Sequence, residues 1–538
     1  MPRNRDEPKK KVIPMALREG AKQAAWTLKL RPPSHLRVEG ENGGCHSCAM
    51  RHLLIFPCLI GLLMPHFPSL TAAADASAQS VVDQLETLQN SELGRPASVG
   101  FILLDAETGD GLVDYYAARL AIPASTMKVI ATGTILHQLG PDYAFRTQLQ
   151  VAGEIEEGEL QGDVILQGGG DPTLGDDGTD AVFDRWTSAL KAAGIQSVSG
   201  RIIGDESRFD TQLVAGESLW MDLGNYYGAG SSALSILENE YRLTFRTGSP
   251  GSPATLLGAS PEPPGLTFIT EMKAGPHGSG DEGYLYSGPY DDTAYARGTL
   301  PPGRGRFSIR GAFPDPARFV ATAFREHLSE AGIEVKGEAT TSRLLAAAGA
   351  DLPKSRTTLN TLESAPLSQL LIDTNRWSRN LNADAAMKTV GAEAYKQGGF
   401  KTGRRAIVEH WEEAGVDLES ANLVDGSGLS RSNLISPRQM AEVLQVLGQS
   451  EVGESFRATL PVAGRSGTIR NFGKNTVFEG KFRAKTGTMN RIKAVAGYLQ
   501  TASGDEVVLV FFVNHYEGSH SQAVAAMEKV IATAYEKF

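Results

Sequence analysis

A serine and a lysine one helical turn apart could together carry out nucleophilic catalysis. Ser125 and Lys128 lie three residues apart at the start of a helical pattern, so their side chains share one face of that helix. A serine hydroxyl is a weak nucleophile until a neighbouring base takes its proton. A lysine amine becomes such a base when burial or nearby cations lower its pKa. The pair therefore predicts an activated serine nucleophile.

This Ser-x-x-Lys motif is one of three short motifs, and each of them occurs twice. The other two are Ser-x-Asn and Lys-Thr-Gly. Patterns of two or three fixed letters arise by chance in a chain of 538 residues, so local context has to choose between the copies. The disfavoured copies begin at Ser188 in the middle of an amphipathic segment, at Ser420 just before a glycine-rich loop, and at Lys401 at a solvated helix start.

The favoured copies have settings that suit a catalytic cleft. Ser378 and Asn380 lie where one helical pattern gives way to another, in a loop that can direct both side chains into a cleft. Lys485-Thr486-Gly487 follows an alternating run and precedes two good strand patterns, 494–501 and 506–514. It therefore suits a strand at the edge of a sheet, where a glycine allows another backbone to approach closely.

The elements around these motifs indicate one domain interrupted by an insert. Helical patterns precede the first pair of strands and close the chain, and Ser125 is expected at a helix N-terminus, where free N–H groups can stabilise an oxyanion. Between residues 146 and 355 the pattern changes to short β-like runs broken by Gly- and Pro-rich stretches, with one helical segment. The expected elements are helices at 80–92, 125–137, 316–332, 437–447 and 521–535, and strands at 99–104, 112–116, 147–151, 163–167, 199–204, 241–246, 494–501 and 506–514.

The composition excludes some kinds of function. Residues 79–538 carry 41 Lys and Arg against 56 Asp and Glu, and an acidic body makes nucleic acid an unsuitable partner. The three cysteines, at positions 45, 48 and 58, lie near the N-terminus. One CxxC without a second pair of metal ligands favours coincidence over zinc or redox chemistry. The cysteines therefore give no indication of a zinc or redox site.

The N-terminal region has the pattern of an export signal. Met50-Arg-His leads into an apolar run, 53–64, followed by small residues with A-x-A cleavage sites after Ala76 and Ala78. The apolar run is short for a membrane span, which favours a cleaved secretory signal at 50–78 over a retained anchor. Residues 1–49 are then an upstream extension, disordered or not translated, and the protein is periplasmic or otherwise exported.

Taken in the order Ser125–Lys128, Ser378–Asn380 and Lys485–Gly487, the motifs resemble those of the penicillin-binding proteins of low molecular mass, class C. The chain is most similar to the penicillin-binding protein 4 type, a serine D-alanyl-D-alanine carboxypeptidase and endopeptidase of peptidoglycan. The 249 residues between Lys128 and Ser378 match that family's habit of inserting domains there. Further stretches that resemble the family begin at Gly169, Trp220, Ser231 and Asp425.

The resemblance implies a fold and an arrangement of domains. The fold is α+β, with a transpeptidase- or β-lactamase-like core in which helices flank an antiparallel sheet, and with inserted mostly-β domains. Residues 79–145 and 356–538 would form the penicillin-binding catalytic domain, and residues 146–355 the inserted domain or domains. Peptidoglycan peptides would be the substrates and β-lactam antibiotics covalent inhibitors, and no metal or organic cofactor would be required. The sequence is also compatible with peripheral membrane contact and leaves the oligomeric state open.

The resemblance also implies a role for each site residue. Ser125 would attack the carbonyl of the penultimate D-Ala while Lys128 accepts its proton, and Ser378 would relay a proton to the leaving amine. Asn380 would position the substrate amide, and Lys485 would supply positive charge. Thr486 and Thr488, beside Gly487, would bind the terminal carboxylate, and the N–H groups of Ser125 and Thr488 would form an oxyanion hole. Asp222 and Arg431 would bind the diamino acid of the stem peptide.

Two alternatives to this function differ in what Ser125 does. A β-lactamase of the same motif class would hydrolyse its β-lactam adduct quickly, although the inserted domains argue against it. A non-catalytic cell-wall binding or scaffold protein would not need Ser125 at all, whereas the complete set of motifs argues against loss of activity.

Overall fold

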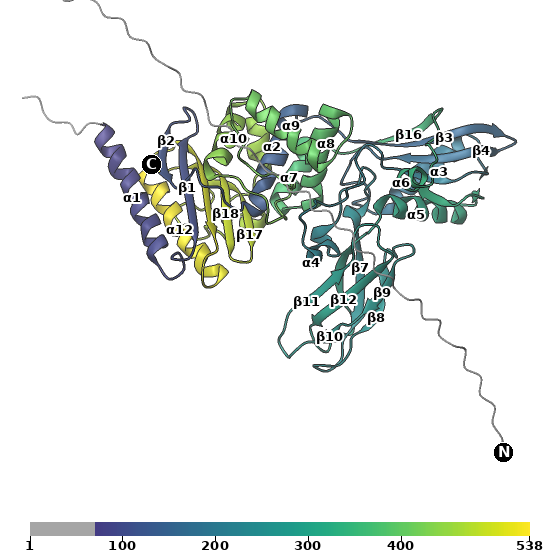
Figure 1. Ribbon diagram of the computed structural model, residues 1–538, viewed down its shortest axis with the longest axis horizontal. Coiled ribbons are helices and arrows are strands. Elements are labelled where there is room, and N and C mark those ends of the chain that lie inside the picture. Colours follow the sequence, from purple (N-terminus) through teal and green to yellow (C-terminus); the bar gives the residue numbers. More distant parts are fainter. Residues whose placement is uncertain (1–69) are drawn as a thin grey trace, which may run out of the picture. The chain divides into compact units, whose positions relative to one another are not determined.

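An antiparallel sheet of five strands brings the first and last parts of the chain together (Figure 1). The computed structural model describes residues 70–538. The expected extension 1–49, the three cysteines and residues 50–69 of the expected signal lie outside the described residues. In spatial order the strands are β17 (Phe482–Met489), β18 (Ile492–Gln500), β19 (Glu506–Asn514), β1 (Ser98–Asp105) and β2 (Gly111–Tyr115).

Helices cover both faces of this sheet, which explains the continuous apolar runs of its central strands. Along β1, Phe101 and Leu103 pack into the core beneath α1 and α12, whereas Ile102 and Leu104 pack into the core beneath α2 and α10. This alternation follows from the period of two in a strand. The helices of this domain are α1 (Leu70–Asn90), α2 (Met127–Leu139), α7 (Leu367–Trp377), α8 (Asn380–Tyr395), α9 (Phe400–Glu413), α10 (Pro437–Gln449), α11 (Gly453–Thr459) and α12 (His520–Lys537).

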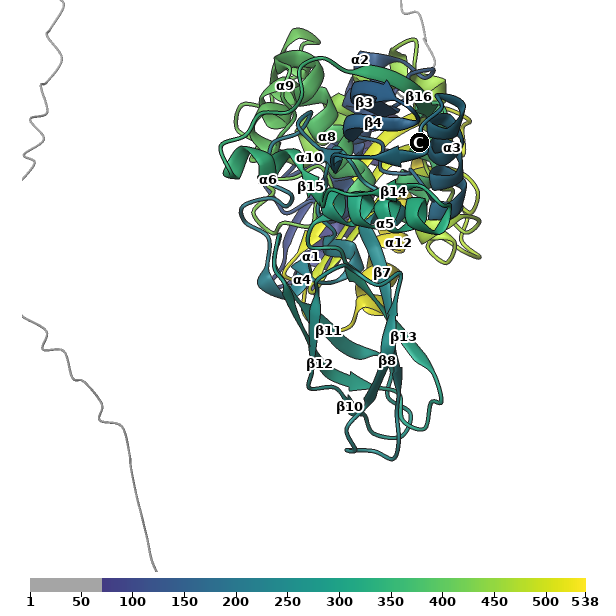
Figure 2. The same ribbon diagram turned by 90° about the vertical axis from the view of Figure 1, so that its right-hand side faces the viewer.

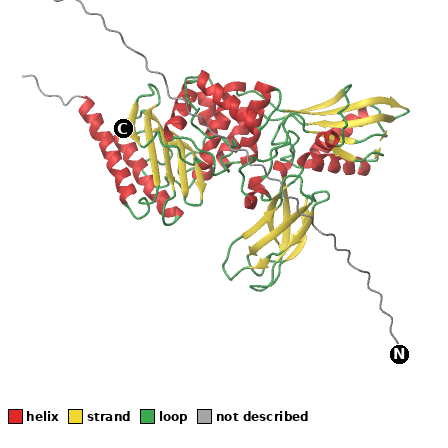
Figure 3. Cartoon of the chain, viewed as in Figure 1, coloured by secondary structure: helices red, strands yellow, loops and turns green. Residues whose placement is uncertain are grey.

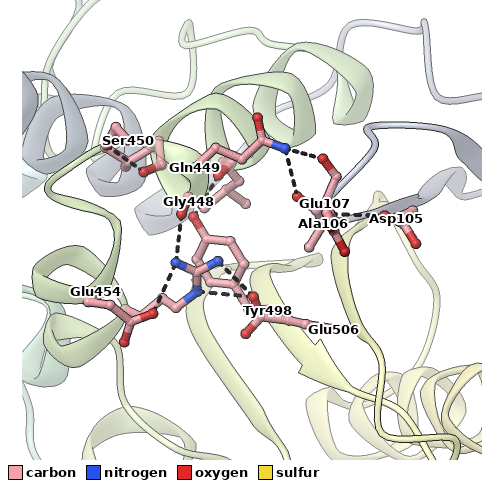
Figure 4. Close-up of polar contacts among 12 residues, drawn as sticks. Asp105, Ala106, Glu107, Gly448, Gln449, Ser450, Glu454, Tyr498 and Glu506 are labelled. Atoms are coloured by element: carbon pink, nitrogen blue, oxygen red, sulfur yellow. Dashed lines mark hydrogen bonds and ion pairs between the residues drawn. The ribbon is translucent and has the colours of Figure 1, made fainter.

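A polar cluster fixes α10 and α11 to the sheet (Figure 4). The guanidinium of Arg457 donates to Glu506 at 2.7 and 3.0 Å and to the carbonyl of Gly448 at 2.8 Å. It also lies 4.5 Å from the ring centroid of Tyr498, whose hydroxyl donates to the carbonyl of Leu444. These contacts connect α10 and α11 to the strands β18 and β19.

The inserted region begins with a mixed sheet of seven strands that carries its own helices (Figure 2). Helix α5 contacts β6 and β15, and α3 contacts β16. Because β16 pairs with β3, this sheet continues past residue 355. Its elements are β3 (Arg146–Glu156), β4 (Glu159–Gln167), β5 (Ser197–Val198), β6 (Ile202–Asp205), β14 (Glu334–Val335), β15 (Ala339–Thr341), β16 (Thr357–Glu363), α3 (Thr179–Ala192), α5 (Pro316–Glu330) and α6 (Ser342–Ala347).

Two smaller sheets form the middle of the insert (Figure 3). The first contains β7 (Glu240–Arg246), β8 (Thr255–Ser260) and β13 (Phe307–Ala312), and the second β9 (Thr267–Thr270), β10 (Lys273–Ala274), β11 (Glu282–Tyr286) and β12 (Thr293–Leu300). Before them comes a loop with one short helix, α4 (Trp220–Leu223), and a turn of 3₁₀ helix, η2 (Tyr226–Gly228).

The predicted fold class is confirmed: an antiparallel sheet flanked by helices is interrupted by a strand-rich insert. Every expected helix and strand is present, and most ends are shifted by a few residues, but the helix expected at 80–92 begins ten residues earlier, at Leu70. None of the helices within residues 70–538 is long and apolar enough to cross a membrane.

Candidate active site

Ser125 lies in a single turn of 3₁₀ helix, η1 (Ala124–Thr126), that leads directly into α2. The turn is closed by Thr126, whose N–H and hydroxyl both donate to the carbonyl of Pro123, at 3.2 and 2.7 Å. Ala124 has a φ of 47°, in the left-handed region that side chains other than glycine rarely adopt. This backbone conformation places a half-buried Ser125 at the N-terminal end of α2.

Lys128 is fully buried and its ammonium nitrogen points at Ser125. The Nζ atom lies 3.3 Å from the Ser125 hydroxyl oxygen and 2.6 Å from each of two acceptors, the side-chain oxygen of Asn380 and the carbonyl of Ser427. A neutral amine has two N–H donors and one lone pair. Because the two shorter contacts take both donors, the lone pair is left for the proton of Ser125. This is the geometry of a general base.

The surroundings of Lys128 adjust its basicity. Burial lowers its pKa from the ordinary 10.5 to about 8, and the charges of Asp384 and Asp425 oppose that shift. Burial also raises the pKa of Asp384 to about 7, with the charge of Asp425 acting in the same direction. A lysine pKa near neutrality gives the amine a useful population of the basic form.

We predict that acylation of Ser125 becomes faster as pH rises through about 8. The charged ammonium cannot accept a proton, so the reactive fraction grows until Lys128 is neutral and then levels off. The second-order rate constant for a β-lactam, measured between pH 6 and 9.5, tests this expectation. Burial also lowers the pKa of Lys493 to about 8, so the profile is repeated with Lys493→Met. A flat profile, or an inflection that disappears in Lys493→Met, would contradict the assignment to Lys128.

The loop 425–431 brings its backbone to the catalytic lysine. The Asp384 carboxylate on α8 accepts from the N–H groups of Gly426 and Ser427 at 3.0 and 2.8 Å. Asp425 accepts from the N–H groups of Gly428 and Ser430, at 2.6 and 2.7 Å. These bonds hold the loop so that the carbonyl of Ser427 faces Lys128. The sequence did not assign a role to Asp384, and its place one turn after Asn380 was the available signal.

The open edge of β17 faces the nucleophile. On that edge the N–H of Ala484 donates to the carbonyl of Pro461, and backbone groups alternate between the two edges of a strand. The N–H groups of Thr486 and Thr488 therefore also lie on this edge, away from β18. A Cβ atom at Gly487 would lie 2.3 Å from the carbonyl oxygen of Pro123 and 3.1 Å from the Ser125 nitrogen. Only glycine permits this approach, so the N–H of Thr488 comes close to that of Ser125.

Two further buried lysines lie on β17 and on the neighbouring strand β18. Lys485 is fully buried and donates to the carbonyl of Thr486 at 2.8 Å. Burial, helped by the charges of Lys128 and Lys493, lowers the pKa of Lys485 well below its ordinary value. Lys493 on the neighbouring strand donates to the hydroxyl of Thr488 at 2.9 Å. An anionic group bound at this edge would relieve the repulsion among these cations.

Ser378 lies at the end of α7 and Asn380 at the start of α8, where one helix gives way to the next as predicted. Ser378 ends α7 in the left-handed conformation, is half-buried, and lines a cavity of about 250 Å³ together with Tyr227 and Arg310. Within residues 70–538 no hydrogen bond joins its hydroxyl to Lys128 or Lys485. Asn380 is held at both ends, because its oxygen accepts from Lys128 and its nitrogen donates to the carbonyl of Tyr227 at 2.7 Å.

Asp222 and Arg431 come from distant parts of the chain and lie within electrostatic reach of each other. Burial raises the pKa of Asp222, while a hydrogen bond from the Tyr227 hydroxyl at 3.3 Å and the charge of Arg431 lower it. Arg431 is exposed at the end of the loop 425–431. Asp222 is linked to Asn380 through Tyr227, whose hydroxyl donates to Asp222 and whose carbonyl accepts from Asn380.

The disfavoured motif copies lie elsewhere. Ser188 is exposed on α3 and Lys401 is exposed at the start of α9. The hydroxyl of Ser420 accepts a hydrogen bond from Gln439 on α10. No group of three or more His, Cys, Asp or Glu in the described residues is arranged to hold a metal ion.

Comparison with known proteins identifies relatives along most of the chain. A D-alanyl-D-alanine carboxypeptidase from Actinomadura sp. (strain R39) is 29% identical over 533 residues, which cover 95% of this chain and 94% of that protein. A carboxypeptidase of the same description from Haemophilus influenzae is 26% identical over 474 residues, covering 84% and 94%.

Solved structures confirm the fold. The crystal structure of penicillin binding protein 4 from H. influenzae has a TM-score of 0.74 at 24% identity and covers 85% of this chain and 99% of that one. The predicted resemblance to the penicillin-binding protein 4 type is confirmed. A model of the D-Ala-D-Ala carboxypeptidase 3 (S13) family matches residues 81–534. Because that match spans most of the chain, the protein belongs to the D-Ala-D-Ala carboxypeptidase 3 (S13) family.

Proposed function

We propose that this protein is a serine D-Ala-D-Ala carboxypeptidase, and in the same active site a D,D-endopeptidase, that cleaves peptidoglycan stem peptides through an acyl-enzyme on Ser125. The observation that carries the proposal is the environment of Lys128. Its buried amine lies 3.3 Å from the Ser125 hydroxyl, and two acceptors at 2.6 Å take its hydrogens. A buried neutral lysine held in this way directs its lone pair at the serine hydroxyl, which is the geometry of a general base.

The proposed mechanism begins with attack on the carbonyl of the penultimate D-Ala. The Ser125 oxygen forms a bond to that carbon while its proton passes to Lys128. The N–H groups of Ser125 and Thr488 stabilise the oxyanion. As the amide bond breaks, the proton held by Lys128 is relayed through the hydroxyl of Ser378 to the leaving nitrogen, so that Lys128 becomes neutral again and Ser378 keeps a proton. Water then hydrolyses the ester, and the serine regains its proton.

The substrate's ends meet complementary charges in this proposal. The terminal carboxylate lies against the hydroxyls of Thr486 and Thr488, near Lys485 and Lys493. Upstream of the scissile bond, Asn380 holds the amide of the substrate. Asp222 and Arg431 hold the ammonium and carboxylate of the diamino acid, because a carboxylate and a guanidinium complement such a zwitterion.

We also propose that the protein acts outside the cytoplasm, where peptidoglycan lies. The signal pattern at 50–78 supports this location. The fully buried side chains of α1 begin at Val81, so cleavage after Ala76 or Ala78 would keep all of them, and cleavage after Ala78 would remove from the packed face only the partly buried Ala78.

The intact mass of the protein purified after export, with and without benzylpenicillin, tests these proposals together. The unmodified mass should correspond to a chain that begins at Ser77 or Gln79. With benzylpenicillin, a stable increase of one drug molecule is expected, as the H. influenzae relative also forms a β-lactam complex. The adduct should be absent from Ser125→Ala and present in Ser188→Ala, which alters the other Ser-x-x-Lys copy.

The outcomes separate the alternatives. An adduct in Ser125→Ala would mean that another serine is the nucleophile. Release of the drug within seconds would favour a β-lactamase, whereas a long-lived adduct favours the peptidase. If no adduct forms in any variant, a non-catalytic cell-wall protein becomes the better description.

A further inference from the structure

Three polar side chains form a stripe along α8, spaced four residues apart. Asn380, Asp384 and Lys388 therefore lie on one face of this helix. Asn380 contacts the catalytic lysine, and Asp384 holds the loop 425–431. Lys388 is the member of the stripe that the mechanism does not use, and its partners belong to the insert.

Lys388 is as completely buried as Lys128. Its ammonium donates to the carbonyls of Gln212 and Ser231, at 2.6 and 2.9 Å, and lies 3.5 Å from a carboxylate oxygen of Asp210. The ring of Phe400 lies 4.7 Å away on another side. Three N–H donors thus meet three acceptors, which a buried ammonium requires.

These acceptors lie at the two ends of one loop. Gln212 precedes the loop 213–230 and Ser231 follows it. The N–H of Ser231 donates to the carbonyl of Leu213 at 2.8 Å, which brings the two ends of the loop together. Between these ends the loop carries α4, with Asp222, and η2, with Tyr227. Lys388 therefore closes the base of the loop that presents Asp222.

The same helix holds this loop at a second point. At the N-terminus of α8, Asn380 donates to the carbonyl of Tyr227 at 2.7 Å, and the hydroxyl of Tyr227 in turn donates to Asp222. Two turns further along, Lys388 fixes both ends of the loop. Side chains of a binding site keep their geometry only when such supporting contacts fix the backbone beneath them.

We propose that Lys388 is a positioning residue for substrate selection, which fixes the loop 213–230 on α8 so that Asp222 is placed for the substrate's diamino acid. The proposal rests on the proposed function of this site. Lys388 does not touch the substrate. Its loss would leave the loop attached to α8 through Asn380 and closed by the bond between Ser231 and Leu213, but without the contact that fixes its base on α8. Selection among substrates would therefore weaken more than the chemistry at Ser125.

The test compares two peptides that end in D-Ala-D-Ala. One carries a free zwitterionic diaminopimelyl side chain, and the other carries lysine acetylated at both nitrogens, which has no charge to offer to Asp222. The ratio of their kcat/KM values is measured for the wild type, Lys388→Met, Asp210→Asn and Asp222→Asn. Lys336→Met is the matched control, because that lysine is exposed and pairs with Glu159 inside the inserted sheet.

We expect Lys388→Met to lower the ratio about tenfold, mainly through a higher KM for the zwitterionic peptide, as Asp222→Asn should also do. Asp210→Asn should lower it in the same direction and less strongly, because both carbonyl partners of Lys388 remain. Lys336→Met should keep the wild-type ratio. Equal losses for both peptides, or an unchanged ratio in Lys388→Met, would overturn the proposal.

If Lys388→Met does not fold, Asp210→Asn decides the matter, because the Asp210 side chain is one-third exposed and tolerates an amide. An unchanged ratio in that variant would then overturn the proposal. Failure of the proposed function would look different. In that case the wild type would form no adduct with benzylpenicillin and would hydrolyse neither peptide.

Discussion

Replacing Lys128 by methionine is expected to slow acylation of Ser125 by a β-lactam about 10²- to 10⁴-fold, the usual contribution of a positioned general base. Methionine fills a similar volume but cannot accept the proton of Ser125, from which the lysine nitrogen is 3.3 Å away. The second-order rate constant of adduct formation, followed by intact mass, measures the loss.

The Lys128→Met variant should still fold, which separates a chemical loss from a structural one. Removing the ammonium leaves Asp384 and Asp425 without their cation, but burial already raises the pKa of both carboxyls. Their protonation can therefore remove the uncompensated charge. The matched control is Lys401→Met in the disfavoured Lys-Thr-Gly copy, which should acylate at the wild-type rate. A Lys128→Met protein that acylates within tenfold of the wild type would mean that another group is the base.

Replacing Gly428 by alanine is expected to slow acylation about a hundredfold, although no functional group is lost. A Cβ at this position would lie 1.9 Å from the carbonyl oxygen of Ala124, the residue before the nucleophile. The turn η1 would have to move, and a displacement of about 1 Å at a reacting group costs about 10² in rate. The glycine also has a φ of +76°, which adds strain to any other residue.

Gly415→Ala separates that strain from the collision. Gly415 has a φ of +88° and open space where a Cβ would lie, so alanine there should cost about 1–2 kcal/mol of folding stability and leave acylation unchanged. Thermal unfolding and acylation rates of the two variants make the comparison. If Gly428→Ala lost stability as Gly415→Ala does but acylated normally, the close packing of the loop 425–431 on η1 would have no catalytic importance.

Much of the fold could be predicted because its signals are local. The nearly continuous apolar runs of β1, β18 and β19 indicate strands buried on both faces. The sequence around Ser378 shows one helix ending where another begins. The three favoured motifs could be assigned to these elements because each lies at the end or edge of one. Local patterns also identified Ser188 and Lys401 as residues of solvated helix surfaces.

The supporting contacts of the site could not be predicted, because they join segments far apart in the sequence. Asp384 reaches the loop that begins at Asp425, and Lys388 reaches Asp210 and Ser231 in the insert. A lysine or an aspartate on a helix is usually solvated, and the only local signal is the spacing of Asp384 and Lys388 one and two turns after Asn380. Only the packing of the insert against α8 shows that Lys388 is buried.

The open edge of β17 has a consequence for resistance to antibiotics. The N–H groups that it presents belong to the main chain, and no substitution other than proline removes a backbone N–H. A point mutation that lowers the sensitivity of this enzyme to β-lactams therefore has to move the edge, fill the space above Gly487, or change the side chains around it. In the proposed mechanism the peptide substrate uses the same edge, so each of these changes would also act on the substrate.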